Sequence, residues 1–200
     1  MHHSKVDVPS ATPPDVEPDL ELMARVARKE SAAERALVRR LFGRVARLAR
    51  LLSGPTVDPD DAAQVALLEI LASAGTFRVA ASLEAWADRI TVRTVARLVR
   101  RESAHKSLLA RWVVPGELPW GKRTEPSNEP LGLDALLARL SPERREALVL
   151  RHALEYSVEE IAELTGAPLG TVKDRLVAAR KELRMALERD ARRAEHRRQS

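Results

Sequence analysis

Hydrophobic residues along most of this chain recur at steps of three, four and seven, the spacing of helices with one buried face. The first such stretch starts at Leu20 and stops at the helix-breaking triplet Ser53, Gly54 and Pro55. We expect one or two amphipathic helices between these limits. Their apolar positions are Leu22, Val26, Leu37, Leu41, Val45, Leu48 and Leu52.

A helix-start signal follows directly, in the sequence DPDD at residues 58–61. Asp58 suits the N-cap, Pro59 suits the first helical position, and the next two acids favour the positive end of the helix dipole. This signal predicts a helix to about Ser73. After a loop over residues 75–81, the pattern predicts another helix from near Ser82 to about Glu102.

Prolines divide the chain into two helical parts. Four of the 12 prolines lie in the first eighteen residues, so we expect residues 1–19 to be a disordered leader. Residues 104–130 contain four further prolines and two glycines, which predict a flexible linker. The fold class expected is therefore all-α, with two small helical domains at residues 20–103 and 131–189 and a basic tail at 190–200.

The second domain contains a helix that stops, turns and restarts within a few residues. Ser157 and Glu160 have the spacing of a capping box, and Gly166 suits the left-handed turn that ends a helix. Pro168 then lies where the next helix would begin. That helix has basic residues on both flanks of an apolar stripe, so the pattern favours a DNA-binding helix-turn-helix over a helical hairpin with solvated charges. Its stripe is Val172, Leu176, Ala179 and Leu183, and its flanking residues are Thr171, Lys173, Arg175, Arg180 and Arg184.

Charge supports an anionic partner. Lys and Arg number 34 against 29 Asp and Glu, which gives a net charge of +5. In the helix expected after Ser82, arginines recur at steps of three and four while three valines occupy the opposite side. We expect this arginine stripe to contact DNA, the alternative being a solvated face paired with Asp88 and Glu102. The stripe is Arg89, Arg93, Arg97, Arg100 and Arg101, and the valines are Val92, Val95 and Val99.

Other classes of function lack support. The chain has no cysteine, its five histidines have no metal-ligand spacing, and no nucleophile and base pair or phosphate-binding glycine loop is evident. We therefore expect no enzyme activity, no cofactor and no metal. No apolar run approaches the length of a membrane span, and the first residues lack the apolar centre of a signal peptide, so we expect a cytoplasmic protein.

The second domain resembles a known family. The sequence LSPERREALVLRHALEYSVEEIAELTGAPLGTVKDRLVAARKEL, residues 140–183, is similar to region 4 of sigma-70-type bacterial RNA polymerase sigma factors, notably the extracytoplasmic-function group. The resemblance implies that this domain recognises the −35 promoter element. It assigns DNA contacts to Thr171, Lys173 and Arg175, with Arg180 on phosphate or in solvent.

The first domain resembles region 2 of the same family. The sequence DPDDAAQVALLEIL, residues 58–71, is similar to region 2.2, which docks on the β′ clamp helices of the polymerase. The alternative for its acid pair is that both residues merely favour a helix N-terminus. The resemblance implies polymerase contacts by Asp60, Asp61, Gln64, Leu67 and Leu68.

Residues 76–102 then resemble regions 2.3 and 2.4, which open and read the −10 element. The resemblance assigns DNA contacts to the arginine stripe, with Arg93 and Arg97 at duplex and Arg100 and Arg101 on phosphates. It adds the rings of Phe77 and Trp86, although a single tryptophan at helical spacing is as readily a core residue.

These resemblances together imply a sigma factor, a detachable subunit that directs promoter-specific transcription initiation while the polymerase supplies catalysis. The implied partners are core RNA polymerase, through its β′ clamp helices and β flap, promoter DNA, and an anti-sigma factor. Two alternatives stay open at this stage. One is a helix-turn-helix regulator that acts without core polymerase, and the other is a sigma-like interaction protein or decoy that does not open DNA.

Overall fold

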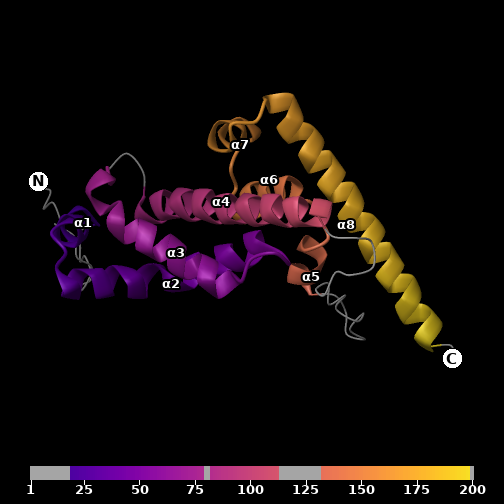
Figure 1. The fold of residues 1–200 in the computed structure, drawn as a ribbon, viewed down its shortest axis with the longest axis horizontal. Coiled ribbons are helices and arrows are strands. Elements are labelled where there is room, and N and C mark those ends of the chain that lie inside the picture. Colours follow the sequence, from indigo (N-terminus) through magenta and orange to yellow (C-terminus); the bar gives the residue numbers. More distant parts are fainter. Residues whose placement is uncertain (1–18, 79–81, 113–131, 199–200) are drawn as a thin grey trace, which may run out of the picture.

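The computed structural model describes residues 19–78, 82–112 and 132–198, and the described residues are helical with no strand. The expected leader, except Asp19, and most of the expected linker lie outside these ranges, and Asp19 begins the first helix. Figure 1 shows two groups of helices that lie against each other, one from each predicted domain. The all-α expectation is confirmed for the described part of the chain.

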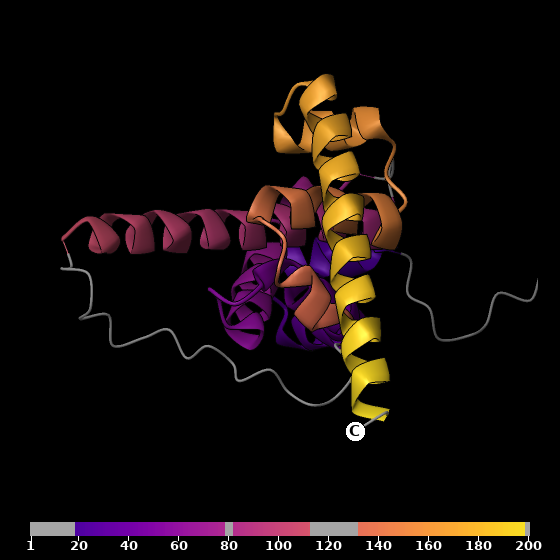
Figure 2. The same ribbon diagram turned by 90° about the vertical axis from the view of Figure 1, so that its right-hand side faces the viewer.

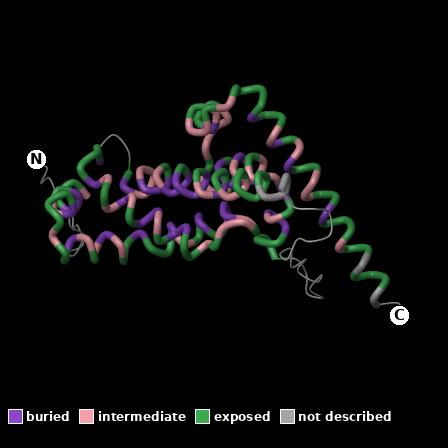
Figure 3. Tube along the Cα trace, viewed as in Figure 1, coloured by how far each residue is buried: buried purple, intermediate pink, exposed green. Residues whose placement is uncertain are grey.

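The first domain is built from α1 (Asp19–Ala27), α2 (Ser31–Ser53), α3 (Pro59–Ala72), the short 3-10 helix η1 (Ala74–Thr76) and α4 (Leu83–Trp112). Helices α2, α3 and α4 pack on one another, and α1 packs on α2 and η1. Their inward faces are buried and their outward faces exposed, as Figure 3 shows. The core is aliphatic and includes Leu37, Leu41, Ile70, Leu83, Val92 and Val95.

Local sequence signals explain where these helices start and stop. The Asp58 carboxylate accepts hydrogen bonds from the backbone N–H groups of Asp60 and Asp61, at 2.8 and 3.1 Å, so the predicted N-cap of α3 is confirmed. The first stretch forms two helices because Lys29 adopts a left-handed conformation, with φ of 60°, between α1 and α2.

Helix α4 is longer than the sequence pattern predicts. It continues past Glu102 to Trp112, so the residues that we expected to begin the linker are helical. The sequence from Ser103 to Trp112 contains neither proline nor glycine, and the first breaker is Pro115. Figure 2 shows the C-terminal half of α4 extending away from the other helices.

The second domain consists of α5 (Leu133–Leu137), α6 (Pro142–Ala153), α7 (Val158–Thr165) and α8 (Leu169–Arg198). Helices α6 and α7 both pack on α8. The capping box of Ser157 and Glu160 is present, and Gly166 ends α7 with φ of 68°. Two predictions about the turn are thereby confirmed, while α8 runs through most of the expected tail and is about 45 Å long, with 30 residues.

Candidate nucleic-acid interfaces

The arginine stripe lies along an exposed edge of α4. Its five arginines are exposed, and the opposing valines Val92, Val95 and Val99 are buried at 1%, 0% and 3%. The predicted division of this helix into a basic outer side and an apolar inner side is therefore confirmed. The stripe runs between α3 on one side and α6 on the other, because Arg97 pairs with Glu69 of α3 and Arg100 lies 4.0 Å from Glu146 of α6.

Glu69 is a neighbour of the stripe that sequence reasoning missed. Its carboxylate accepts hydrogen bonds from the Thr94 hydroxyl and the Arg97 guanidinium. Burial alone would raise the pKa of Glu69, but these two hydrogen bonds and the Arg97 charge lower it below its usual value. Glu69 thus stays ionised and holds Arg97 against α3, whereas Arg93 makes no ion pair with any described residue.

The two acids considered as partners of the stripe are occupied elsewhere. Asp88 lies on the buried side of α4 and pairs with Arg44 of α2. Glu102 lies 4.0 Å from Lys106, one turn further along α4. Neither acid pairs with a stripe arginine, so the stripe keeps a net positive charge.

The two aromatic residues assigned to the −10 region lie mostly inside the first domain. Phe77 is 6% exposed, and its ring packs edge-on against Trp86, with centroids 5.6 Å apart. Trp86 is half-buried and packs against the core. The burial of Phe77 is at odds with direct contact between its ring and DNA. In this structure Phe77 closes the core beside Trp86 of α4, and its assignment to DNA stays a prediction.

The predicted polymerase-binding residues occupy the outer side of α3. Asp60, Asp61 and Gln64 are exposed, and Leu68 is 60% exposed. These four positions fall within an arc of about 100° around the helix. Leu67 differs, since it is 9% exposed and belongs to the core. Leu67 therefore packs in the core in this structure, and its contact with polymerase stays a prediction. Leu68 is the leucine of this pair that α3 presents to solvent.

The helix-turn-helix presents the first half of α8 to solvent. Val172, Leu176 and Ala179 are buried against α6 and α7. These three residues form a buried stripe along α8. Thr171 and Lys173 are exposed on opposite flanks of this stripe, and Arg175 is half-buried beside Thr171. Arg144 of α6 pairs with Glu182 of α8, which adds an ion pair to the apolar packing between these helices.

The side of α8 opposite its buried stripe contains two residues that sequence reasoning missed. Val177 is 64% exposed and Lys181 is also exposed, on the same side as Asp174. An exposed valine on a DNA-facing helix can contact a thymine methyl group, and a lysine can contact phosphate. Neither stood out in the sequence because a single polar or apolar residue in a charged helix carries little signal.

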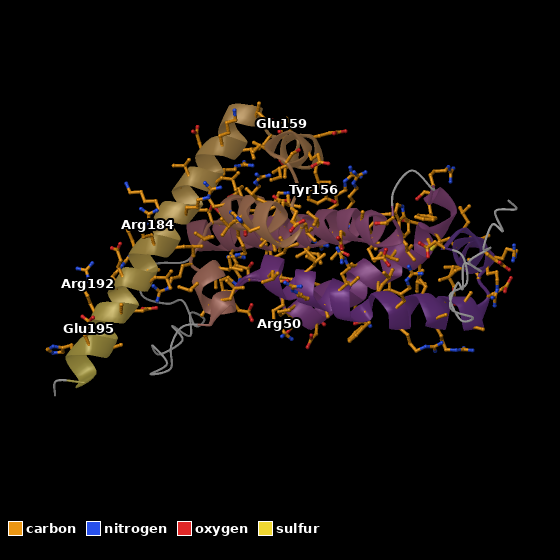
Figure 4. All side chains as sticks on the ribbon, turned by 180° about the vertical axis from the view of Figure 1, so that it is seen from behind. Arg50, Tyr156, Glu159, Arg184, Arg192 and Glu195 are labelled. Carbon is orange, nitrogen blue, oxygen red and sulfur yellow. The ribbon has the colours of Figure 1, made fainter. Side chains whose placement is uncertain are left out.

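An apolar groove of about 590 Å³ lies between the two domains. Its walls come from α2, α5, α6 and α8, and include Leu51, Leu148 and Leu183. Three exposed arginines, Arg47, Arg180 and Arg184, border it and form no ion pair with a described residue. Figure 4 shows Arg184 about midway along α8, before the C-terminal part of the helix that carries Arg192 and Glu195. The groove thus combines leucine walls with a positive rim.

No group of three or more metal-ligating side chains comes together in the described residues. No helix among them is long and apolar enough to cross a membrane.

Comparisons with known proteins agree with the geometry of both domains. The family described as Sigma-70 region 2 matches residues 37–105, and the family described as Sigma-70, region 4 matches residues 131–183. The chain is 34% identical over 165 residues to the extracytoplasmic-function (ECF) RNA polymerase sigma factor SigM of Mycobacterium tuberculosis, with 82% of each chain covered. It is 31% identical to ECF RNA polymerase sigma factor SigE of Mycolicibacterium smegmatis, over 74% of this chain and 59% of that protein.

Solved structures show the same fold. One is CnrH in complex with the cytosolic domain of CnrY, with a TM-score of 0.54 and 25% identity over 87% of this chain and 99% of CnrH. Another is the sigma factor RpoE of Bartonella quintana in complex with the anti-sigma factor NepR, with a TM-score of 0.55 and 24% identity over 76% of this chain and 94% of that one.

Proposed function

This chain belongs to the sigma-70 family of RNA polymerase sigma factors, in its extracytoplasmic-function group, and on that premise we propose which of its surfaces bind DNA and polymerase. As a sigma factor it binds core RNA polymerase and promoter DNA and directs transcription initiation. Sigma factors are regulators without catalytic activity of their own, and we place this one with the polymerase in the cytoplasm.

We assign the −10 element to the arginine stripe of α4. The observation that supports this most strongly is the net positive charge of the stripe, since Asp88 and Glu102 pair with other residues and only Glu69 and Glu146 pair with stripe arginines. Arg93 lies at the centre of the stripe with no ion pair to a described residue, so a phosphate or base edge is its natural partner. Arg97 can exchange Glu69 for DNA, because both side chains are more than one third exposed. Trp86 is the half-buried ring next to this surface.

We assign the −35 element to the exposed half of α8. Thr171, Lys173 and Arg175 lie within the first two turns of the helix, where the second helix of a helix-turn-helix meets base edges. Val177 and Lys181 extend the same surface, and Arg180 is placed for phosphate. Together these residues lie on both flanks of the buried stripe of α8 and opposite it, and the major groove is wide enough to admit a helix.

We assign the β′ clamp helices to the outer side of α3. Asp60, Asp61, Gln64 and Leu68 offer two carboxylates, an amide and one exposed apolar side chain along two turns of helix. The alternative role of the acids, stabilising the helix N-terminus, is already filled in part by the Asp58 cap. We therefore propose that the carboxylates of Asp60 and Asp61 pair with basic residues on the polymerase.

We assign helical protein partners to the groove. Its leucine walls suit the apolar side of an amphipathic helix, and the rim of Arg47, Arg180 and Arg184 suits acidic residues beside that side. The related sigma factor RpoE was solved in complex with an anti-sigma factor, and we propose that an anti-sigma segment or the polymerase β flap occupies the groove here. Both would compete for the same leucines.

A footprint tests the −35 assignment. Core polymerase is combined with the wild-type chain or with the triple variant Thr171→Ala, Lys173→Ala, Arg175→Ala on a promoter fragment that the wild type protects. Loss of upstream protection, with polymerase binding intact, is the expected result. The double variant Arg189→Ala, Arg192→Ala is the control, because these exposed residues lie on the C-terminal half of α8. Unchanged protection by the triple variant would refute the assignment.

A further inference from the structure

A buried arginine joins the two domains. The Arg145 side chain, from α6, is 2% exposed, and no carboxylate among the described residues pairs with it. Its guanidinium instead donates to four backbone carbonyls. The acceptors are Leu137 O at 2.9 Å, Leu140 O at 3.0 Å, Leu52 O at 3.2 Å and Ala138 O at 3.4 Å.

These carbonyls belong to the ends of two helices from different domains. Leu52 lies in the last turn of α2, and Leu137 is the last residue of α5. The last carbonyls of a helix lack partners within the helix and carry the negative end of its dipole. A single guanidinium therefore caps α5 within its own domain and α2 in the other.

Gly54 shows how closely the domains approach at this point. It follows α2 with φ of 63°, a region that side-chain-bearing residues rarely adopt. A Cβ atom there would lie 1.8 Å from Arg145 Nη1 and 2.3 Å from Cζ. Both the backbone conformation and the space around Gly54 thus exclude any side chain while Arg145 is in place.

The second domain also brings acids to the arginine stripe. Glu146, next to Arg145 in α6, lies 4.0 Å from Arg100. Glu160 of α7 is a capping-box residue whose carboxylate also feels the charge of Arg89. The second domain therefore places one acid near each end of the stripe, where DNA phosphates would otherwise lie.

We propose that Arg145 is a latch that holds the free sigma factor closed, and that the latch must open before the stripe can bind promoter DNA. This inference rests on the assignment of the stripe to DNA. Of the four hydrogen bonds of Arg145, opening breaks only the one to Leu52, because the other three acceptors lie in the second domain. Opening also separates α6 from α2 and α4 and breaks the contact between Arg100 and Glu146. The second domain can therefore stay folded when the chain opens, and the closure can be reversed.

The chain offers a direct test of closure because it contains no cysteine. Cysteines introduced by Arg35→Cys on α2 and Glu163→Cys on α7, both at exposed positions, take spin labels, and pulsed electron paramagnetic resonance measures the distance between them. In the free protein we expect one dominant, narrow distance population, with at most a minor one at longer distance. Gly54→Ala is expected to broaden it and move it to longer distances. Gly43→Ala is the matched control, because nothing lies within 4 Å of a Cβ at that exposed position in α2.

A second variant separates opening of the latch from damage to the end of α2. Ala96 of α4 borders the domain contact together with Pro142 and Glu146, so Ala96→Phe should push the domains apart without touching Gly54 and without adding a charge to the stripe. Circular dichroism checks that both variants keep their helices. A narrow distribution in both folded variants, or a broad one in the wild type, would overturn the latch.

Binding of the free chain to a duplex promoter fragment tests the consequence. Opening should raise the affinity about tenfold if roughly one wild-type molecule in ten is open, since the apparent affinity scales with the competent fraction. Unchanged affinity in variants shown to be open would overturn the regulatory role of the latch. The distance measurement needs neither DNA nor polymerase, so it remains valid even if the assignment of the stripe fails.

Discussion

The Arg44 guanidinium of α2 holds both oxygens of the Asp88 carboxylate of α4, with Nε to Oδ1 and Nη2 to Oδ2 distances of 2.6 Å. Asp88 is almost fully buried, with a side chain 4% exposed, whereas the Arg44 side chain is 45% exposed. The hydrogen bonds to Asp88 raise the pKa of Arg44 further above its ordinary value. This pair fixes α4 on α2 and removes Asp88 from the charge balance of the stripe.

Replacing Arg44 and replacing Asp88 should lower the free energy of unfolding by unequal amounts. Arg44→Met leaves a buried carboxylate without a partner, and we expect it to lower the free energy of unfolding by about 2–3 kcal/mol, allowing for the exposure of Arg44. Asp88→Asn leaves only an exposed arginine and should cost about 1 kcal/mol. Urea unfolding of the two variants measures both values. Equal losses of unfolding free energy in the two variants would show that the buried carboxylate does not need Arg44 as a partner.

The double variant Arg93→Ala, Arg97→Ala should spare polymerase binding and weaken promoter binding. Each lost phosphate contact lowers the magnitude of the slope of log K against log salt by about one unit, so a salt titration of holoenzyme on promoter DNA measures the effect. Arg35→Ala, Arg39→Ala is the matched control, because these exposed arginines of α2 form no ion pair with a described residue. An unchanged slope in the stripe variant would mean that the stripe is only solvated.

Reversing one charge on α3 should weaken holoenzyme assembly more than folding. Asp61→Lys places a lysine near the positive end of a helix, at a cost of about 0.3–1 kcal/mol in stability. Glu34→Lys, in the first turn of α2, makes the same kind of change away from the proposed polymerase surface. We expect only Asp61→Lys to lower affinity for core polymerase. Equal affinities of the two variants, measured by fluorescence anisotropy, would remove Asp61 from the contact.

Glu146 should make the protein less stable as pH rises. Burial raises the pKa of Glu146 above its usual value, although the charges of Arg100 and Arg175 oppose this. A carboxyl group whose pKa is raised on folding favours the folded state most below its unfolded pKa, and this advantage is lost as pH rises through the folded pKa. Glu146→Gln should therefore raise the melting temperature at pH 7 and flatten its pH dependence above about pH 4. Thermal unfolding between pH 4 and pH 8 checks this, and an unchanged or lowered melting temperature at pH 7 would contradict it.

Local signals made the helix ends predictable. The Asp58 cap, the capping box at Ser157 and the left-handed turn at Gly166 each depend on residues within a few positions of one another, so the sequence contains all the information needed. The end of α4 was misplaced because the first proline after it lies several residues beyond the point where the apolar pattern fades.

Contacts between distant segments were not predictable in this way. The pairing of Glu69 with Thr94 and Arg97, and the insertion of Arg145 beneath α2, depend on how whole helices pack. The burial of Leu67 and Phe77 has the same origin, because periodicity alone does not show which side of a strongly apolar helix or loop meets a neighbour. Family resemblance predicts which surfaces bind partners, and packing decides which side chains are exposed on those surfaces.

Transcription in vitro with core polymerase tests the central claim most directly. The purified chain is added to core enzyme and a promoter template, and the RNA products are mapped. We expect RNA with one defined start site from the wild type, no such RNA from core enzyme alone, and reduced product from Arg93→Ala, Arg97→Ala at equal polymerase occupancy. Wild-type holoenzyme that forms a stable complex with the promoter yet yields no start-specific RNA on any promoter that it protects would contradict the account.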